Sequence, residues 1–365
     1  MSKIKVLIVD DSAFMRKLIS EFLAEDSRIE VIGTARNGRD AVQKIEKEKP
    51  DVITLDVEMP IMDGLEALRI IMKQTPTAVI MLSSTTKEGA DSTLKAMEIG
   101  AVDFIAKPSG AISLDLYKIK TDLINKIVAA SKTNVSKLQN NPLNIEIIQG
   151  NSDNYSKIEP VHNNNLSPQI SEKTPFAKKM IVIGTSTGGP RALQTVLTQL
   201  PKNIEAPILI VQHMPPGFTK SLANRLNTLS EITVKEAEDG EILKKGTAYI
   251  AKGGYHLKIK KVGMSLAIQT DQSPLRNGHR PSVDVLFESA SQIIDVEKVA
   301  VVMTGMGIDG AKGLTALSKS GRLSAIAESE KTSIVFGMPK AAIATNVINK
   351  VADVEDIAKA IVNYC

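Results

Sequence analysis

The chain has 365 residues, a formal net charge of +4, and contents of 43% hydrophobic and 24% charged residues. These fractions are typical of globular proteins and exclude a wholly disordered or fibrous chain, and the length predicts two or three domains. Cys365 is the single cysteine, which excludes an intramolecular disulfide and a cysteine-based metal site.

Scarce aromatic residues and short apolar runs argue against nucleic-acid binding and against a membrane-spanning protein. Aromatic residues make up 3% of the chain and Trp is absent, which argues against base stacking on nucleic acid. The start MSKIKVLIVDD has no signal-peptide pattern, and no apolar run reaches the roughly 18 residues that span a bilayer. We therefore expect a cytoplasmic protein with no nucleic-acid partner and no direct membrane insertion.

Residues 1–130 alternate short apolar runs with amphipathic stretches. This alternation is typical of a parallel sheet covered by helices on both faces, and five such units predict a flavodoxin-like domain with strand order 2-1-3-4-5. The expected strands are 4–10, 29–35, 52–56, 78–82 and 103–107. The expected helices are 13–25, 38–48, 64–74, 87–99 and 115–130.

Carboxylates follow two neighbouring strands of this predicted sheet. Asp10 and Asp11 end the first strand and Asp56 ends the third, so the three side chains meet at one edge. Because they repel one another, a divalent cation such as Mg²⁺ would stabilise the group. Ser83 and Lys107 follow the fourth and fifth strands. Their hydroxyl and ammonium groups are the kind that a phosphoryl group on a carboxylate would need. The alternative is that Asp10, Asp11 or Ser12 merely caps the next helix.

The segments LIVDDSAFMR, DVITLDVEMPIMDGLEAL and DFIAKP resemble the receiver domain of two-component response regulators across nearly all of residues 1–130. The resemblance implies that Asp56 accepts phosphate from a histidine kinase. It further implies Mg²⁺ held by Asp11, Asp56 and the backbone carbonyl of Glu58, with Asp10 acting through water. Ser83, Phe104 and Lys107 match the positions that respond to phosphorylation.

Residues 131–176 are rich in Asn, Ser, Pro and Lys and have no sustained apolar period, so we expect a flexible linker. Residues 143–148 could add a brief strand or helical turn. Residues 1–130 carry 18 basic and 20 acidic residues, whereas the remainder carries 27 and 21. This mild asymmetry leaves open both a solvated surface and the steering of an anionic partner.

Residues 177–365 repeat the alternation less regularly and predict a second α/β domain. We expect a mainly parallel sheet with an antiparallel addition near 232–270. The expected strands are 179–184, 207–212, 247–252, 256–260, 265–270, 299–305 and 323–327. The expected helices are 189–199, 218–229, 282–294 and 309–319.

A glycine-rich turn, GTSTGGPRALQ, joins the first of these strands to a helix. Free N–H groups at a helix start can hold an anion, so nucleotide phosphate binding is one interpretation. The other is a serine nucleophile, Ser186, on a G-x-S-x-G turn. No Gly-Lys-Ser/Thr follows, which excludes a P-loop, and the next strand ends in His213 where a dinucleotide fold needs an acidic residue.

Ser186, His213 and Asp309 each follow the end of a predicted strand. Together they supply a nucleophile, a base and a carboxylate that orients the base. Taken singly, each has a structural alternative, because Ser186 and Asp309 could cap helices and His213 could be a packed histidine. His256 and His279 are rival bases, although His256 opens a strand and His279 suits a substrate rim.

The segments IGTSTGGP, VQHMP, HRPSVDVLF and TGMGIDGA resemble the catalytic domain of chemotaxis protein-glutamate methylesterases. The resemblance implies the triad Ser186, His213 and Asp309, with the backbone N–H of Met306 stabilising the oxyanion. Thr187 and Gly188 offer further N–H groups there on geometry alone. It also implies hydrolysis of glutamate methyl esters on chemoreceptors, deamidation of receptor glutamines, and no cofactor for the esterase reaction. The alternative is a response regulator with a DNA- or nucleotide-binding output domain.

Overall fold

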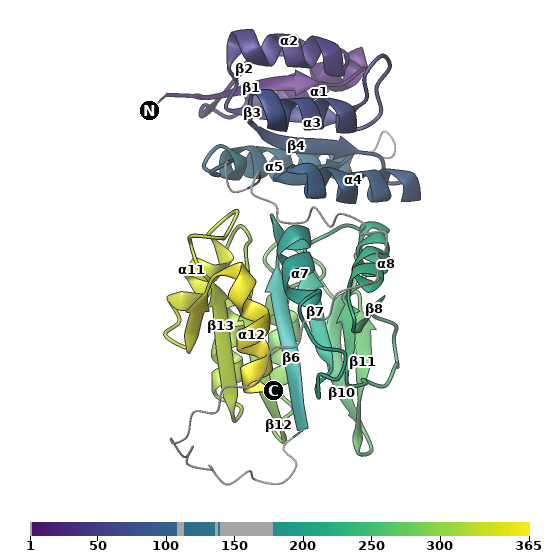
Figure 1. The fold of residues 1–365 in the computed structure, drawn as a ribbon, viewed down its shortest axis with the longest axis vertical. Coiled ribbons are helices and arrows are strands. Elements are labelled where there is room, and N and C mark those ends of the chain that lie inside the picture. The colour runs from purple at the N-terminus through teal and green to yellow at the C-terminus, as the bar shows by residue number, and fades with distance from the viewer. Residues whose placement is uncertain (1, 108–112, 136–137, 139–177) are drawn as a thin grey trace, which may run out of the picture.

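The computed structural model describes residues 2–107, 113–135, 138 and 178–365. These residues form an N-terminal unit in purple and blue and a C-terminal unit in teal to yellow (Figure 1). The expected linker at 131–176 lies almost wholly outside the described residues, as does the element expected at 143–148. The domain boundaries at 130 and 177 therefore stay predictions.

The N-terminal unit is a parallel sheet whose described strands run in the order β2-β1-β3-β4-β5, as predicted. All residues of β3 and β4 are buried, because helices cover both faces of the sheet. The strands are β1 (Ile4–Val9), β2 (Ile29–Ala35), β3 (Val52–Asp56), β4 (Ala78–Ser83) and β5 (Asp103–Ala106). The helices are α1 (Ala13–Ala24), α2 (Gly38–Glu48), α3 (Gly64–Gln74), α4 (Lys87–Ile99) and α5 (Ser113–Ala130).

The first four of these helices begin in the same way. In each, a polar side chain just before the helix accepts a hydrogen bond from a backbone N–H of the first turn. Such capping satisfies a donor that the helix itself leaves free. The capping residues are Ser12, Asn37, Asp63 and Thr86. Ser12 is thus the cap of α1, and Asp10 does not cap the helix but accepts a hydrogen bond from the backbone N–H of Ser12 at 2.9 Å.

The C-terminal unit contains a parallel sheet of order β14-β13-β12-β6-β7-β9-β8 and the antiparallel pair β10–β11. The fold class is as predicted. The antiparallel addition is smaller than expected, because β8 and β9 join the main sheet. The strands are β6 (Lys178–Thr185), β7 (Ile208–Gln212), β8 (Thr233–Glu236), β9 (Thr247–Ile250), β10 (His256–Val262), β11 (Ser265–Asp271), β12 (Val296–Val302), β13 (Leu323–Glu328) and β14 (Lys350–Ala352).

The helices of the C-terminal unit are α7 (Gly189–Leu197), α8 (Phe218–Leu229), α9 (Val283–Ser291), α10 (Ala311–Ser318), α11 (Met338–Ile343) and α12 (Val354–Tyr364). The adjacent strands β12, β6 and β7 lead into the loops that carry Asp309, Ser186 and His213. Strand β12 ends at Val302 rather than at the expected residue 305, so Asp309 is delivered by a loop of several residues.

The two units touch through α4 and β5 on one side and α7 and α8 on the other (Figure 1). The rings of Phe104 and Phe218 stack across this contact with centroids 4.6 Å apart, and both side chains are buried. Buried apolar residues of both units belong to one continuous cluster. None of the helices in the described ranges is long and apolar enough to cross a membrane.

Candidate active site and phosphoacceptor pocket

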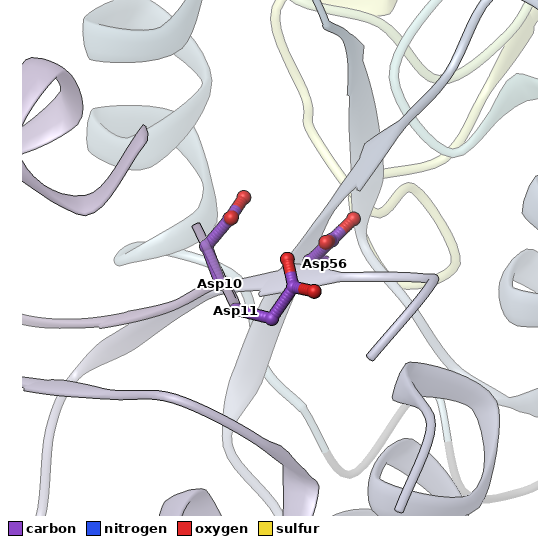
Figure 2. A group of neighbouring side chains, drawn as sticks. All are labelled: Asp10, Asp11 and Asp56. Atoms are coloured by element: carbon purple, nitrogen blue, oxygen red, sulfur yellow. The ribbon is translucent and has the colours of Figure 1, made fainter. Parts of the chain in front are cut away.

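The three carboxylates predicted at one edge of the first sheet do lie together there. Asp10 and Asp11 follow β1 and Asp56 ends β3, and their oxygens can lie within 4.8 Å of one another (Figure 2). Asp10 and Asp56 are buried, while Asp11 is exposed. The guanidinium of Arg16 donates to the backbone carbonyls of Asp10 and Asp11 and so fixes the strand end.

Lys107 enters this pocket from β5 and bridges two of the carboxylates. Its Nζ lies 2.9 Å from Asp10 Oδ2 and 2.8 Å from Asp56 Oδ2. Burial raises the pKa of Asp56 to about 6, although the Lys107 ammonium partly opposes the rise. Burial alone would lower the pKa of Lys107, but hydrogen bonds to Asp56 and Asp10 raise it above its usual value. The pocket therefore combines two buried carboxylates with one ammonium group that bridges them.

The donor set fits Mg²⁺. Hard carboxylate oxygens from Asp10, Asp11 and Asp56 converge there, and magnesium prefers one or two carboxylates together with water. The carboxylate of Asp56 accepts a hydrogen bond from the backbone N–H of Glu58. Glu58 thus lies beside the pocket, as a backbone ligand would have to.

The side chains at two other predicted switch positions have partners outside the carboxylate group. The Ser83 hydroxyl donates to the backbone carbonyl of Gly89 at 2.9 Å, at the start of α4. Phe104 packs against Phe218 of the C-terminal unit. The roles of Ser83 and Phe104 as switch residues stay predictions.

The structure also brings Ser186, His213 and Asp309 together. His213 Nδ1 lies 3.2 Å from Ser186 Oγ, and His213 Nε2 lies 2.8 Å from Asp309 Oδ2. Because a carboxylate can only accept, the proton sits on Nε2, and the Nδ1 lone pair faces the serine hydroxyl. This is the tautomer that lets His213 take a proton from Ser186.

Asp309 is a buried carboxylate held by five donors. Apart from His213, these are the backbone N–H groups of Val283 and Asp284 and the side chains of Ser282 and Asn277. Burial alone would raise the pKa of Asp309, but the hydrogen bond from His213 and the other donors lower it below its usual value. Asp309 therefore stays charged and can stabilise a protonated His213.

The helix-cap alternatives for Ser186 and Asp309 do not match the structure. Helix α7 is capped by Gly188 and α10 by Gly310, so neither Ser186 nor Asp309 is the capping residue. The rival base His256 is fully buried, and its Nε2 pairs with the carbonyl of Pro274. The other rival, His279, lies flat against the ring of His213 with centroids 3.8 Å apart.

Backbone N–H groups beside Ser186 are free to hold an oxyanion. Those of Thr187, Gly188 and Met306 donate no hydrogen bond to any other described residue. Gly188 has φ +78°, and a Cβ built there would lie 2.7 Å from side-chain atoms of Ile334. A glycine is therefore required at position 188 for the chain to turn shortly after Ser186. The oxyanion role of the three N–H groups stays a prediction.

Several residues that support the site were not predicted. Asp284 accepts from the N–H groups of Gly310 and Gly313, while its own N–H donates to Asp309. The side-chain amide of Gln212 donates to the carbonyls of Ser186 and His213. The sequence offered one clue to these supporting residues. The dipeptide Asn277-Gly278 is a common signal for a tight turn.

The N-terminal unit contacts the turn that carries Ser186. Asp103 Oδ2 accepts a hydrogen bond from the hydroxyl of Thr187, the residue after Ser186, at 2.5 Å. Arg225 of α8 pairs with Glu98 of α4 at 2.8 Å. The first domain thus contacts the residue that follows Ser186.

Comparison with known proteins gives the same assignment for both halves. Residues 181–361 match the family described as CheB methylesterase, and residues 6–116 match the response regulator receiver domain. The chain is 55% identical to a protein-glutamate methylesterase/protein-glutamine glutaminase of Halalkalibacterium halodurans, over 100% of this chain and 99% of the relative. It is 51% identical to the protein of that name in Bacillus subtilis, over 98% and 97% of the two chains.

A solved structure agrees with the family assignment. The C-terminal half resembles the crystal structure of the Thermotoga maritima CheB methylesterase catalytic domain, with a TM-score of 0.51 and 45% identity. The match covers 52% of this chain and 100% of that domain. These similarities do not favour a DNA- or nucleotide-binding output domain.

Proposed function

The chain belongs to the CheB methylesterase family, and on that premise we propose that Ser186, His213 and Asp309 carry out its reaction. The protein is a protein-glutamate methylesterase and protein-glutamine glutaminase of chemotaxis, joined to a response-regulator receiver domain. The observation that carries the proposal is the continuous hydrogen-bonded series from Ser186 Oγ through His213 to Asp309.

The reaction begins with proton transfer. His213 Nδ1 takes the proton of Ser186 Oγ as that oxygen attacks the γ-carbonyl carbon of a glutamate methyl ester. The negative charge moves to the carbonyl oxygen, where the N–H groups of Met306, Thr187 and Gly188 can stabilise it. One such donor contributes on the order of 3 kcal/mol to lowering the barrier. Asp309 stabilises the imidazolium that forms.

The bond to the leaving group then breaks. His213 gives its proton to the departing methoxide, which leaves as methanol, and a γ-glutamyl ester of Ser186 remains. His213 next takes a proton from water, the hydroxide attacks the acyl carbon, and the proton returns to Ser186 as glutamate is released. A glutamine side chain follows the same course with ammonia as the leaving group.

The receiver pocket supplies control. Asp56 is the proposed phosphoacceptor, the phosphodonor is a chemotaxis histidine kinase, and the substrates are methyl-accepting chemoreceptors. Asp11, Asp56 and the carbonyl of Glu58 would hold Mg²⁺, with Asp10 acting through water, and the ion would offset phosphoryl charge. Ser83, Phe104 and Lys107 would report phosphorylation to the contact with the catalytic domain. For the esterase reaction itself we expect no cofactor.

The test is a methanol-release assay on methylated chemoreceptor with the full chain. Ser186→Ala should lower the rate by roughly 10⁴-fold or more, because the nucleophile is lost. Release of ammonia from receptor glutamines should fall in parallel. Ser318→Ala, which removes a hydroxyl from the exposed face of α10, is the matched control and should keep the wild-type rate. Near-normal methanol release by Ser186→Ala would exclude this mechanism.

A further inference from the structure

A tight turn, Arg276 to His279, lies against the catalytic residues. Arg276 and His279 exchange both backbone hydrogen bonds, at 3.0 and 2.9 Å. The two central residues have positive φ, +53° at Asn277 and +81° at Gly278. This is the conformation that Asn-Gly favours in two-residue hairpin loops. The turn is therefore well defined, and it fixes the directions of the side chains it carries.

Two side chains of this turn contact the His213–Asp309 pair. The ring of His279 lies on that of His213 with centroids 3.8 Å apart and planes inclined by 13°. The amide of Asn277 donates to Asp309 Oδ1 at 2.7 Å and to Asp284 Oδ2 at 2.8 Å. One short loop thus supports the base from its flat face and the carboxylate from the side.

The His279 ring can remain stacked on His213 while His213 gains and loses a proton. Burial and then the charge of His213 lower the pKa of His279 to about 3, with a further contribution from Lys126 and an opposing one from Asp309. His279 is therefore uncharged at neutral pH and does not repel the imidazolium that His213 becomes. The face of an uncharged ring attracts a nearby cation.

We propose that His279 is a positioning residue for the reaction, whose ring fixes the plane of the His213 imidazole while Asn277 of the same turn fixes Asp309. His279 exchanges no proton with substrate in this role. It holds His213 Nδ1 toward Ser186 Oγ and Nε2 toward Asp309. The inference rests on the proposed function, since it concerns the same base.

If His279 positions His213 through its ring alone, any flat ring at position 279 should support the reaction. In the full chain, His279→Phe should keep kcat for methanol release within about 5-fold of wild type. His279→Leu fills similar space without a flat face. It should lower kcat at least about 10-fold with KM unchanged, because small misplacements of a catalytic group are costly. Thermal melting of both variants checks that the fold is intact.

A second variant tests the other half of the turn. Asn277→Gly keeps the positive φ of the turn but removes the amide that lies between the two carboxylates. It should lower kcat by about 10-fold, again with little change in KM, because Asp309 loses one of its donors and faces Asp284 directly.

Several outcomes would overturn the inference. Equal loss of activity in His279→Phe and His279→Leu would mean that the ring nitrogens are needed for proton transfer or hydrogen bonding. Wild-type kcat in His279→Leu would make the ring a bystander, and a change in KM alone would make it a substrate contact. Ser186→Ala in the same assay separates the two claims. If that variant stays active, the proposed function fails, whereas an inactive Ser186→Ala beside a fully active His279→Leu removes the positioning role alone.

Discussion

The ring of His213 presents its two nitrogens in the opposite order to the familiar serine-protease triad. There, Nε2 faces the serine and Nδ1 faces the aspartate, whereas here Nδ1 faces Ser186 and Nε2 faces Asp309. The chemistry is unchanged, because each nitrogen of a neutral imidazole can be donor or acceptor. The orientation follows from where β7 ends and from the four other donors that fix Asp309.

Asp309→Asn tests the carboxylate as the group that orients His213. The substitution keeps the shape but removes the charge and one acceptor, so His213 loses its preferred tautomer. We expect kcat to fall by about 10³- to 10⁴-fold with a smaller change in KM. Asp295→Asn, the same change on an exposed carboxylate, is the control and should keep wild-type kcat. Equal kcat in the two variants would contradict the assignment.

The lowered pKa of Asp309 also predicts a pH dependence of stability. A depressed carboxylate contributes stability above its unfolded pKa, here an ordinary 3.8, and loses it as the pH falls toward the folded pKa. Below 3.8 the contribution should decline by about 1.4 kcal/mol per pH unit. Urea unfolding at pH 6 and pH 3 should therefore show a smaller difference between wild type and Asp309→Asn at pH 3. A difference that does not shrink would be inconsistent with a depressed pKa.

The main residues of both sites could be placed from the sequence because parallel strands gather their following residues at one edge. Asp10, Asp56, Ser186 and His213 all directly end or follow strands. The supporting residues could not be placed, because Asn277 and Asp284 lie in a loop and at a helix start whose approach to Asp309 depends on tertiary packing. The contact of His279 with His213 also depends on tertiary packing and could not be placed from the sequence.

The two units differ in whether a polar side chain caps the start of the helix near the site. In the N-terminal unit, α1 to α4 start with side-chain caps that satisfy the first-turn N–H groups. In the C-terminal unit, α7 starts at Gly188 with no side-chain cap. The N–H groups beside Ser186 thus remain available for a developing negative charge.

A matched pair of glycines tests this helix start. Gly188 and Gly217 both precede helices with positive φ, +78° and +88°. A Cβ at position 188 would meet Ile334 at 2.7 Å, whereas one at 217 would meet nothing within 4 Å. Gly217→Ala should cost about 1 kcal/mol of backbone strain and keep its kcat. Gly188→Ala should be less stable and lose at least about 10-fold in kcat, because the turn after Ser186 must shift.

Comparing Gly188→Ala with Gly217→Ala can also contradict the requirement for glycine at position 188. Stability can be followed by urea unfolding and kcat by methanol release. If Gly188→Ala and Gly217→Ala show the same stability and the same kcat, the packing around the nucleophile turn is looser than the structure indicates.

Long apolar strands and amphipathic helices could be predicted within a few residues, as in β3 and α8. Elements β8, β14, α11 and α12 were not predicted. Strand β14 has three residues and α11 has six, too few to show a period. Helix α12 does bury one face, including Ile357 and Ile361, and this spacing could have been recognised.

At the scale of the whole molecule, the receiver domain contacts the turn that carries Ser186. Asp103 bonds to Thr187 beside the nucleophile, and Phe104 stacks on Phe218. Because Phe104 and Lys107 lie on and just after the same strand, a change at Asp56 has a short path to this contact. We expect the unphosphorylated chain to be inhibited by its own receiver and phosphorylation to shift a two-state equilibrium toward exposure.

A charge swap tests this contact in the full chain. Glu98 and Arg225 form a partly exposed ion pair between α4 and α8. Reversing one charge by Glu98→Arg should raise the unphosphorylated rate of methanol release about 2- to 5-fold, since such pairs contribute up to about 1 kcal/mol. Adding Arg225→Glu should restore the low rate. Unchanged rates in both variants would show that this pair does not hold the closed state.

Removing the receiver extends the same test. Residues 176–365 alone should release methanol faster than the unphosphorylated full chain, because nothing then covers Ser186. Circular dichroism establishes that the fragment is folded before rates are compared. Equal rates would exclude the blocking model.

The central claim is that Ser186, activated by His213, is the nucleophile, and covalent labelling tests it most directly. The full chain, phosphorylated with a small-molecule phosphodonor and Mg²⁺, is treated with a fluorophosphonate and analysed by peptide mass spectrometry. We expect one label per chain, on Ser186, and at least about 10²-fold slower labelling in His213→Gln, because the hydroxyl then lacks its base. Labelling of a different serine, or wild-type labelling in His213→Gln, would contradict the account.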